Sequence, residues 1–130
     1  MKKAIFCGLI AVLALSACQE SLEEKAVKEA VDYTKKNCPL PINEYQYLDS
    51  FTFERSTHTF GYYYKMVGAM DTAAAIQPAE MARSLKENVK NATFLKPYKD
   101  EGYSFKYVFY SEKNPDVVYY ATSVTEADYR

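Results

Sequence analysis

Two stretches of the chain place their apolar residues at the three- and four-residue spacing of an amphipathic helix. The first covers residues 21–37, where Ser21 with Glu24 three positions later forms a capping-box pattern and prolines follow the last residue. The second covers residues 78–90 and begins with Pro78, which suits the first turn of a helix. The pattern predicts one helix shortly after residue 20 and a second one further along the chain.

Four other stretches show the two-residue alternation or the β-branched and aromatic content of strands. Residues 45–55 and 60–66 are separated by a short polar loop and predict a hairpin, and residues 103–110 and 117–124 flank the turn Asn114-Pro115-Asp116. The order of elements is αββ–αββ. It predicts an α+β domain of two layers, a four-stranded antiparallel sheet with two helices on one face.

The first seventeen residues follow a different pattern. Met1-Lys2-Lys3 is positively charged, residues 4–15 are apolar, and small residues lead up to Cys18. This is the layout of a secretory signal peptide, and the apolar run is shorter than the roughly 20 residues of a membrane-spanning helix. We therefore expect a signal peptide over residues 1–17 and a single small domain over residues 18–130.

The motif Leu15-Ser16-Ala17-Cys18 resembles the lipobox of bacterial lipoproteins. The resemblance implies cleavage before Cys18, a diacylglyceryl thioether on its sulfur and an acyl group such as palmitate on its amino group, which together anchor the protein in a membrane. Ordinary secretion with Cys18 left as a thiol is the alternative. An Asp directly after the lipidated Cys resembles an inner-membrane retention signal, and this chain has Gln19 at that position. The outer membrane is therefore favoured, and either its periplasmic or its surface leaflet could hold the anchor.

A looser resemblance covers the chain from Cys38 onward. Cys38-Pro39, Leu48-Asp49-Ser50, Tyr62-Tyr63-Tyr64 and Gly102 with Tyr107 are similar to a pattern in a group of small exported bacterial proteins of unassigned function. This resemblance implies an export-adapted fold and no activity.

Cys38 is the one thiol that remains if residues 1–17 are removed and Cys18 carries lipid. One thiol cannot form an internal disulfide. A small buried residue is the favoured interpretation of Cys38, an intermolecular disulfide is the second, and a catalytic thiol is the last, because no base lies near it in the sequence.

Charge and motif content argue against several function classes. The formal net charge is −1, which gives no reason to expect nucleic acid as a partner. The sequence has no His pair or Cys cluster for a metal and no glycine-rich phosphate loop, so we expect no metal, no cofactor and no enzyme. His58 is the only histidine, and Glu54 is the one acid close enough in sequence to orient it as a base.

Thirteen tyrosines are the one functional lead in the composition. Alternation puts many aromatic residues on one face of each strand, where a core is the simplest explanation. Tyr63, Tyr110, Tyr119 and Tyr120 remain as candidates for the opposite, exposed sheet face. Tyrosine buries a large area at low entropic cost, so these four residues form our candidate binding face.

These observations favour a membrane-anchored, non-catalytic binding or accessory domain of the bacterial envelope that contacts an envelope protein through a Tyr-rich sheet face. An inhibitor or immunity-type module is the alternative, acting on an envelope enzyme through the His58 loop and the Asn114-Pro115-Asp116 loop. A small hydrolase that uses His58 and Glu54 ranks third.

Overall fold

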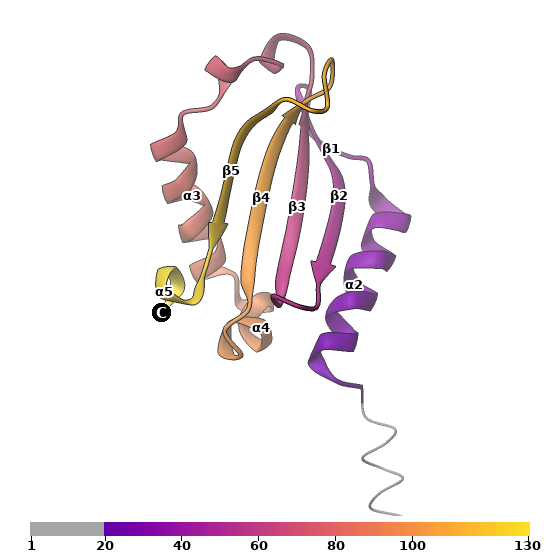
Figure 1. Cartoon of the computed structure of the whole chain (residues 1–130), viewed down its shortest axis with the longest axis vertical. Helices are drawn as coiled ribbons and strands as arrows, with labels where there is room; N and C mark the ends of the chain where they lie inside the picture. The colour runs from indigo at the N-terminus through magenta and orange to yellow at the C-terminus, as the bar shows by residue number, and fades with distance from the viewer. Residues whose placement is uncertain (1–19) are drawn as a thin grey trace, which may run out of the picture.

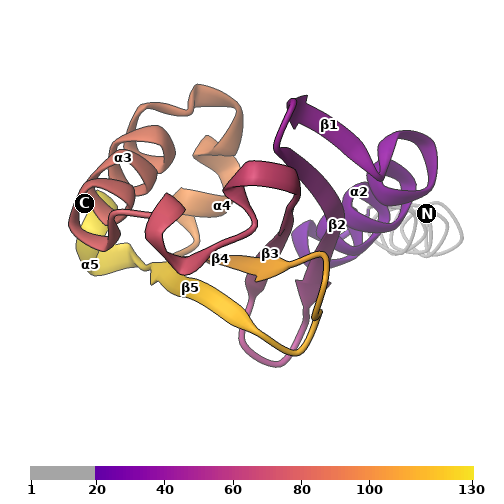
Figure 2. The same ribbon diagram turned by 90° about the horizontal axis from the view of Figure 1, so that it is seen from above.

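The computed structural model describes residues 20–130 as one sheet with helices on one of its faces (Figures 1 and 2). The expected signal peptide and Cys18 lie outside the described residues. The elements in chain order are α2 (Leu22–Asn37), β1 (Leu40–Asn43), β2 (Gln46–Glu54), β3 (Thr59–Met66), α3 (Pro78–Asn91), α4 (Lys96–Asp100), β4 (Ser104–Ser111), β5 (Val118–Val124) and α5 (Glu126–Tyr129), with 3₁₀ turns η1 (Gly68–Met70), η2 (Ala73–Ala75) and η3 (Thr93–Leu95).

The predicted four-stranded antiparallel sheet with two helices is wrong. The sheet has five strands in the order β1-β2-β3-β4-β5, and β3 pairs with β4 in parallel, while the described residues form four α-helices. The extra strand, β1, has four residues and contains a proline, so its pattern resembles a loop. Alternation shows which residues share a face of a strand but not which strands are neighbours, and the long connection from β3 to β4 allows the parallel pairing.

Local sequence explains where the two long helices begin. Ser21 accepts a hydrogen bond from the backbone N–H of Glu24 at 3.1 Å and caps α2. Pro78 occupies the first turn of α3, where a backbone N–H would have no partner within the helix, so the lack of an N–H in proline costs no hydrogen bond. Both expected helix starts are thus confirmed within one residue.

The core lies between the sheet and the helices. Its largest fully buried side chains come from β3, β4, β5 and α3 and are Phe60, Phe105, Phe109, Val89 and Val124. Figure 2 shows α3 and α4 on the same side of the sheet, with α2 beside β2 at the opposite end from α3. None of the helices of residues 20–130 lies on the other face of the sheet.

A single threonine fastens α2 to the sheet. The Thr34 hydroxyl donates to the backbone carbonyl of Phe51 at 2.7 Å and accepts from the backbone N–H of the same residue at 2.9 Å. These two bonds give the backbone groups of Phe51 a partner at the edge of β2, in the half that β1 does not cover, because β1 pairs only with residues 46–48.

Within residues 20–130, no helix combines the length and the apolar character needed to cross a bilayer.

Candidate binding groove

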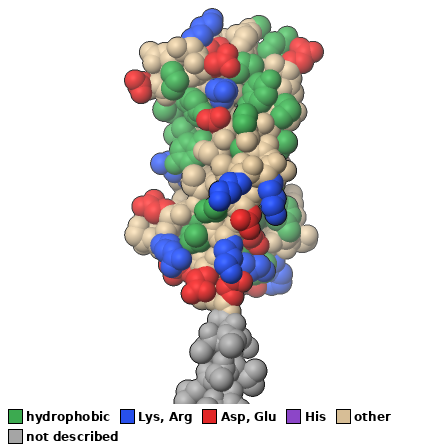
Figure 3. Space-filling view, turned by 90° about the vertical axis from the view of Figure 1, so that its right-hand side faces the viewer, with side chains coloured by type: hydrophobic (Ala, Val, Ile, Leu, Met, Phe, Trp, Pro, Cys, Tyr) green, Lys and Arg blue, Asp and Glu red, His purple; other side chains and the backbone are tan. Residues whose placement is uncertain are grey.

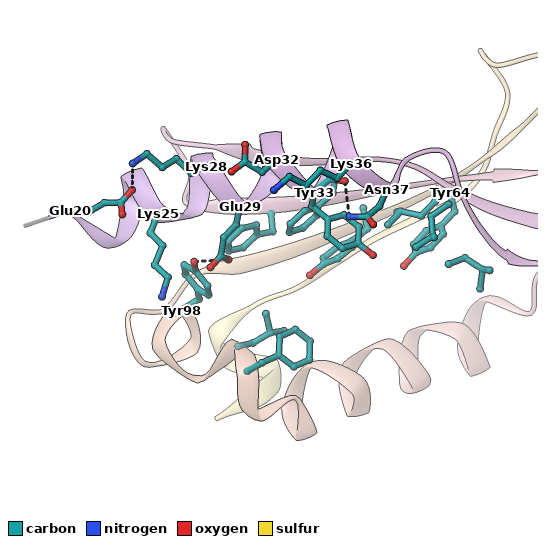
Figure 4. A pocket seen from close by; sticks show the side chains of 18 residues that line it. Glu20, Lys25, Lys28, Glu29, Asp32, Tyr33, Lys36, Asn37, Tyr64 and Tyr98 are labelled. Carbon is teal, nitrogen blue, oxygen red and sulfur yellow. Dashed lines mark hydrogen bonds and ion pairs between the residues drawn. The ribbon is translucent and has the colours of Figure 1, made fainter.

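An open groove of about 840 Å³ runs along α2 between this helix and the turn η3 (Figure 4). We call it the α2 groove. Its floor is the helix-side face of β2 and β3, and its far wall is the segment after α3. The side chains that form the floor and the far wall are Leu48, Phe51, Phe60, Tyr62, Tyr64, Phe94 and Leu95.

The groove exists because α2 presents small side chains to the sheet. The buried residues of α2 are Ala26 and Ala30, whereas those of α3 are Leu85 and Val89. An alanine cannot reach across the aromatic stripe of β2 and β3. Part of that stripe therefore stays uncovered between the two helices, although its residues have the spacing of a core.

The floor residues Tyr62 and Tyr64 stack on rings of β4 that are themselves buried. The rings of Tyr62 and Tyr107 lie 4.7 Å apart with an interplanar angle of 6°, and those of Tyr64 and Phe109 lie 4.9 Å apart with an angle of 12°. Phe51 contacts Tyr62 at 4.8 Å. Burial raises the pKa of the Tyr62 and Tyr107 hydroxyls, so both stay neutral. This aromatic layer is uncharged and suited to apolar contacts.

One end of the groove is closed by a link between α2 and α4. The Tyr98 hydroxyl donates to the Glu29 carboxylate at 2.8 Å. Burial, with a contribution from Glu29, raises the pKa of Tyr98, which keeps this donor protonated. The opposite end reaches Leu40 and Ile42 of β1, and the Ile42 side chain is 49% exposed.

The α2 rim is charged with both signs. Lys28 pairs with Glu20 at 2.8 Å, and Lys25, Asp32 and Lys36 also line the groove. Figure 3 shows charged side chains gathered at the end of the molecule where the described chain begins, with hydrophobic side chains gathered toward the other end. The rim can thus contact polar groups while the floor contacts apolar ones.

Phe94 is the most exposed large apolar residue of the described chain. Its side chain is 78% exposed, although it lies beside Leu95, which is buried. It borders both the α2 groove and a smaller hollow of about 250 Å³ next to Leu85 and Val89. Phe94 thus exposes an aromatic ring between the two hollows.

A family model described as "Domain of unknown function (DUF8479)" matches residues 21–120. The chain belongs to this family. The match includes α2, the sheet as far as Tyr120 and the whole α2 groove apart from Glu20. No curated protein is similar enough to this DUF8479 chain to be reported as a relative.

Two solved structures share the fold of this DUF8479 chain. One is a protein of Pseudomonas aeruginosa described as secreted (PA3611), with a TM-score of 0.66 and 16% identity, covering 86% of this chain and 100% of the other. The second is the pilotin EpsS of the Vibrio vulnificus type 2 secretion system, with a TM-score of 0.60 and 14% identity, covering 84% and 92% of the two chains. The likeness agrees with the resemblance to small exported bacterial proteins and, at these identities, concerns the fold.

The four tyrosines of the candidate binding face do not share one surface. All four are half-buried. The Tyr110 hydroxyl donates to Asp49, and the Tyr119 hydroxyl donates to Asp71 at 2.7 Å. Tyr120 packs against the buried Phe109 ring from the helix side. Their role in binding stays a prediction, while the structure gives three of them an internal partner.

Tyr63, the fourth of these residues, covers a glycine. A Cβ atom on Gly61 would lie 2.8 Å from the Tyr63 ring and 2.5 Å from Thr52 Oγ1. The Tyr63 ring therefore occupies the space that a side chain at position 61 would need.

The other candidate residues lie apart from the α2 groove. His58 sits in the β2–β3 turn with φ 49°, stacks on Tyr103 at 4.6 Å and lies 3.6 Å from Glu23. Glu54 accepts a hydrogen bond from Ser56 instead of orienting His58. Cys38 is half-buried with a free thiol, whose pKa is raised by burial. Among residues 20–130, no three His, Cys, Asp or Glu side chains gather in a way that could hold a metal.

Proposed function

We propose that this DUF8479 protein is a non-catalytic accessory domain of the bacterial envelope that binds a segment of a protein partner in the α2 groove. The observation that carries the proposal is the uncovered aromatic floor beneath α2, bordered by the exposed Phe94. The fold shared with a pilotin and a secreted protein supports the envelope setting.

The form of the groove favours a protein segment over a small molecule. Small-molecule sites bury most of their ligand, whereas this groove is about half open to solvent. It follows α2, whose 16 residues span about 24 Å at 1.5 Å per residue. A polypeptide can use that length, placing apolar side chains on the floor and polar ones against the charged rim.

The lipid anchor on Cys18 belongs to the same proposal and places the domain at the outer membrane. Glu20 lies two residues after Cys18 and already lines the groove, so an anchored groove would open close to the bilayer surface. Mass spectrometry of the mature protein tests this part. An unmodified Cys18, or a Cys18→Ser variant that stays in the membrane fraction, contradicts it.

The groove is tested by isolating the protein with its partners from its own membranes. Phe94→Asp places a charge between the two apolar hollows and should lower the yield of a specific partner by about tenfold or more. Val31→Asp is the matched control, because Val31 lies on α2 with its side chain 48% exposed and does not line the groove. Equal recovery with both variants, at equal thermal stability, contradicts the proposal.

A further inference from the structure

In the part of the chain that the structure describes, no strand lies beside the outer edge of β5. β5 is the last strand of the sheet and pairs only with β4. Within residues 20–130, no backbone or side-chain group outside the sheet hydrogen-bonds to the backbone of Tyr119–Val124. Every second N–H and C=O along this edge is consequently available to another extended backbone.

The opposite edge of the sheet is closed by three separate features. β1 is only four residues long and carries Pro41, which has no N–H to offer. Where β1 ends, the Thr34 hydroxyl occupies both backbone groups of Phe51, and α2 runs alongside. The same chain thus protects one edge against strand pairing and leaves the other one free.

The composition of β5 also favours pairing. Residues 117–125 contain no charged residue, no proline and no glycine, and are rich in β-branched and aromatic side chains. Exposed edges normally carry lysine, proline or an inward-pointing charge that prevents pairing. The irregularity near Tyr119 disturbs only one end of the strand and leaves Tyr120–Val124 in regular register with β4.

We propose that the β5 edge takes an extended segment of another polypeptide as a sixth strand. The site is separate from the α2 groove. Ala121 and Ser123 lie opposite Val108 and Lys106 on the helix-free face and are exposed, so they leave room for large side chains of the incoming strand on that face. Backbone hydrogen bonds supply the affinity and these two small positions supply selectivity.

A second copy of this chain does not fit the edge. Figures 1 and 2 both show α3 beside β5 and beyond it, away from β4. Pairing of two β5 edges about a twofold axis would place α3 of each copy over the β5 edge of the other, so the two helices would collide. A single strand brings no second helix and would place only its own helix-side side chains next to α3. The occupant is therefore a segment of a different protein.

The experiment uses a displayed library of random nonapeptides as the probe and the full chain as the target. A selected peptide should slow amide exchange of Tyr119–Val124 by about tenfold or more. The peptide is then made with N-methyl groups on its odd or its even residues. One set should weaken binding by about tenfold or more and the other should not, because alternate N–H groups point to opposite sides of a strand.

Matched variants separate this site from the α2 groove. Ala121→Lys with Ser123→Lys should abolish peptide binding, whereas Thr57→Lys with Ser84→Lys adds the same charge elsewhere and should not. Phe94→Asp should leave peptide binding unchanged, so failure of the groove proposal would not affect this result. Three outcomes overturn the inference: no selected peptide protects β5, both N-methyl sets act alike, or the protein dimerises through β5.

Discussion

The two long helices cover the same face of the sheet with opposite results. α3 brings Leu85 and Val89 into the core, while α2 brings Ala26 and Ala30. α2 also leaves Val31 48% and Tyr33 39% exposed. The sheet beside α3 keeps a hollow of about 250 Å³, whereas the sheet beside α2 is left with an aromatic groove of about 840 Å³. The two halves of the sheet face therefore differ in how large the apolar side chains above them are.

The largest expected effect contrasts these two halves directly. Leu85→Ala removes a buried side chain of α3 and should lower the free energy of unfolding by about 2–5 kcal/mol. Val31→Ala on α2 should change it by no more than about 0.5 kcal/mol. Denaturant unfolding of both variants measures the difference. Similar losses would mean that α2 packs as firmly as α3.

A second prediction concerns the attachment of α2. Thr34→Val keeps the shape of the side chain but leaves the backbone N–H and C=O of Phe51 without their partner, which should cost about 1–3 kcal/mol of stability. Thr34→Ser is the control, because it keeps the hydroxyl and should retain most of the stability. If serine is as harmful as valine, the methyl packing rather than the hydrogen bonds holds α2.

The contrast between the helices also shows what the sequence could predict. The start of each helix was readable from Ser21 and Pro78, because capping is a local property. The uncovered floor was not readable, since Phe51, Tyr62 and Tyr64 have the same alternation whether or not a helix covers them. The signal lay in Ala26 and Ala30, which are too small to cover an aromatic stripe.

The strand order and the exposure of Phe94 could not be predicted from local sequence, because both depend on how distant segments pack together. β1 is short and contains a proline, so its role as a strand depends on pairing with β2. The parallel pairing of β3 with β4 depends on how the intervening helices pack. Phe94 looks like a core residue in the sequence, and only the direction of the turn before α4 exposes it.

A third prediction sharpens the description of the α2 side. Tyr98→Phe removes the hydrogen bond to Glu29 that closes one end of the groove, and should lower stability by about 1 kcal/mol. Amide exchange should accelerate in α4 and the first half of α2, while α3 stays protected. Glu29→Gln keeps an acceptor for the Tyr98 hydroxyl and should have a smaller effect. Faster exchange throughout the molecule would show that the link supports the whole fold.

The smallest expected effect lies on the α3 side and depends on pH. The Asp128 carboxylate accepts from the Thr125 backbone N–H at 2.8 Å and lies 3.5 Å from the Lys86 ammonium, which fastens α5 to α3. The Thr125 hydrogen bond first, and Lys86 in addition, lower the pKa of Asp128 below its usual value. A carboxyl with a lower pKa in the folded state stabilises the fold above its unfolded pKa, near 4, and loses this contribution as pH falls through the folded pKa.

The free energy of unfolding, measured from about pH 6 to pH 2, should therefore decline less steeply for Asp128→Asn than for the unmodified protein. Lys86→Met should give an intermediate slope, because it removes the charge partner but leaves the Thr125 hydrogen bond. An unchanged slope in Asp128→Asn would mean that α5 is held to α3 by Tyr129 packing alone. The Asp128 carboxylate would then contribute nothing to the stability of the α3 side.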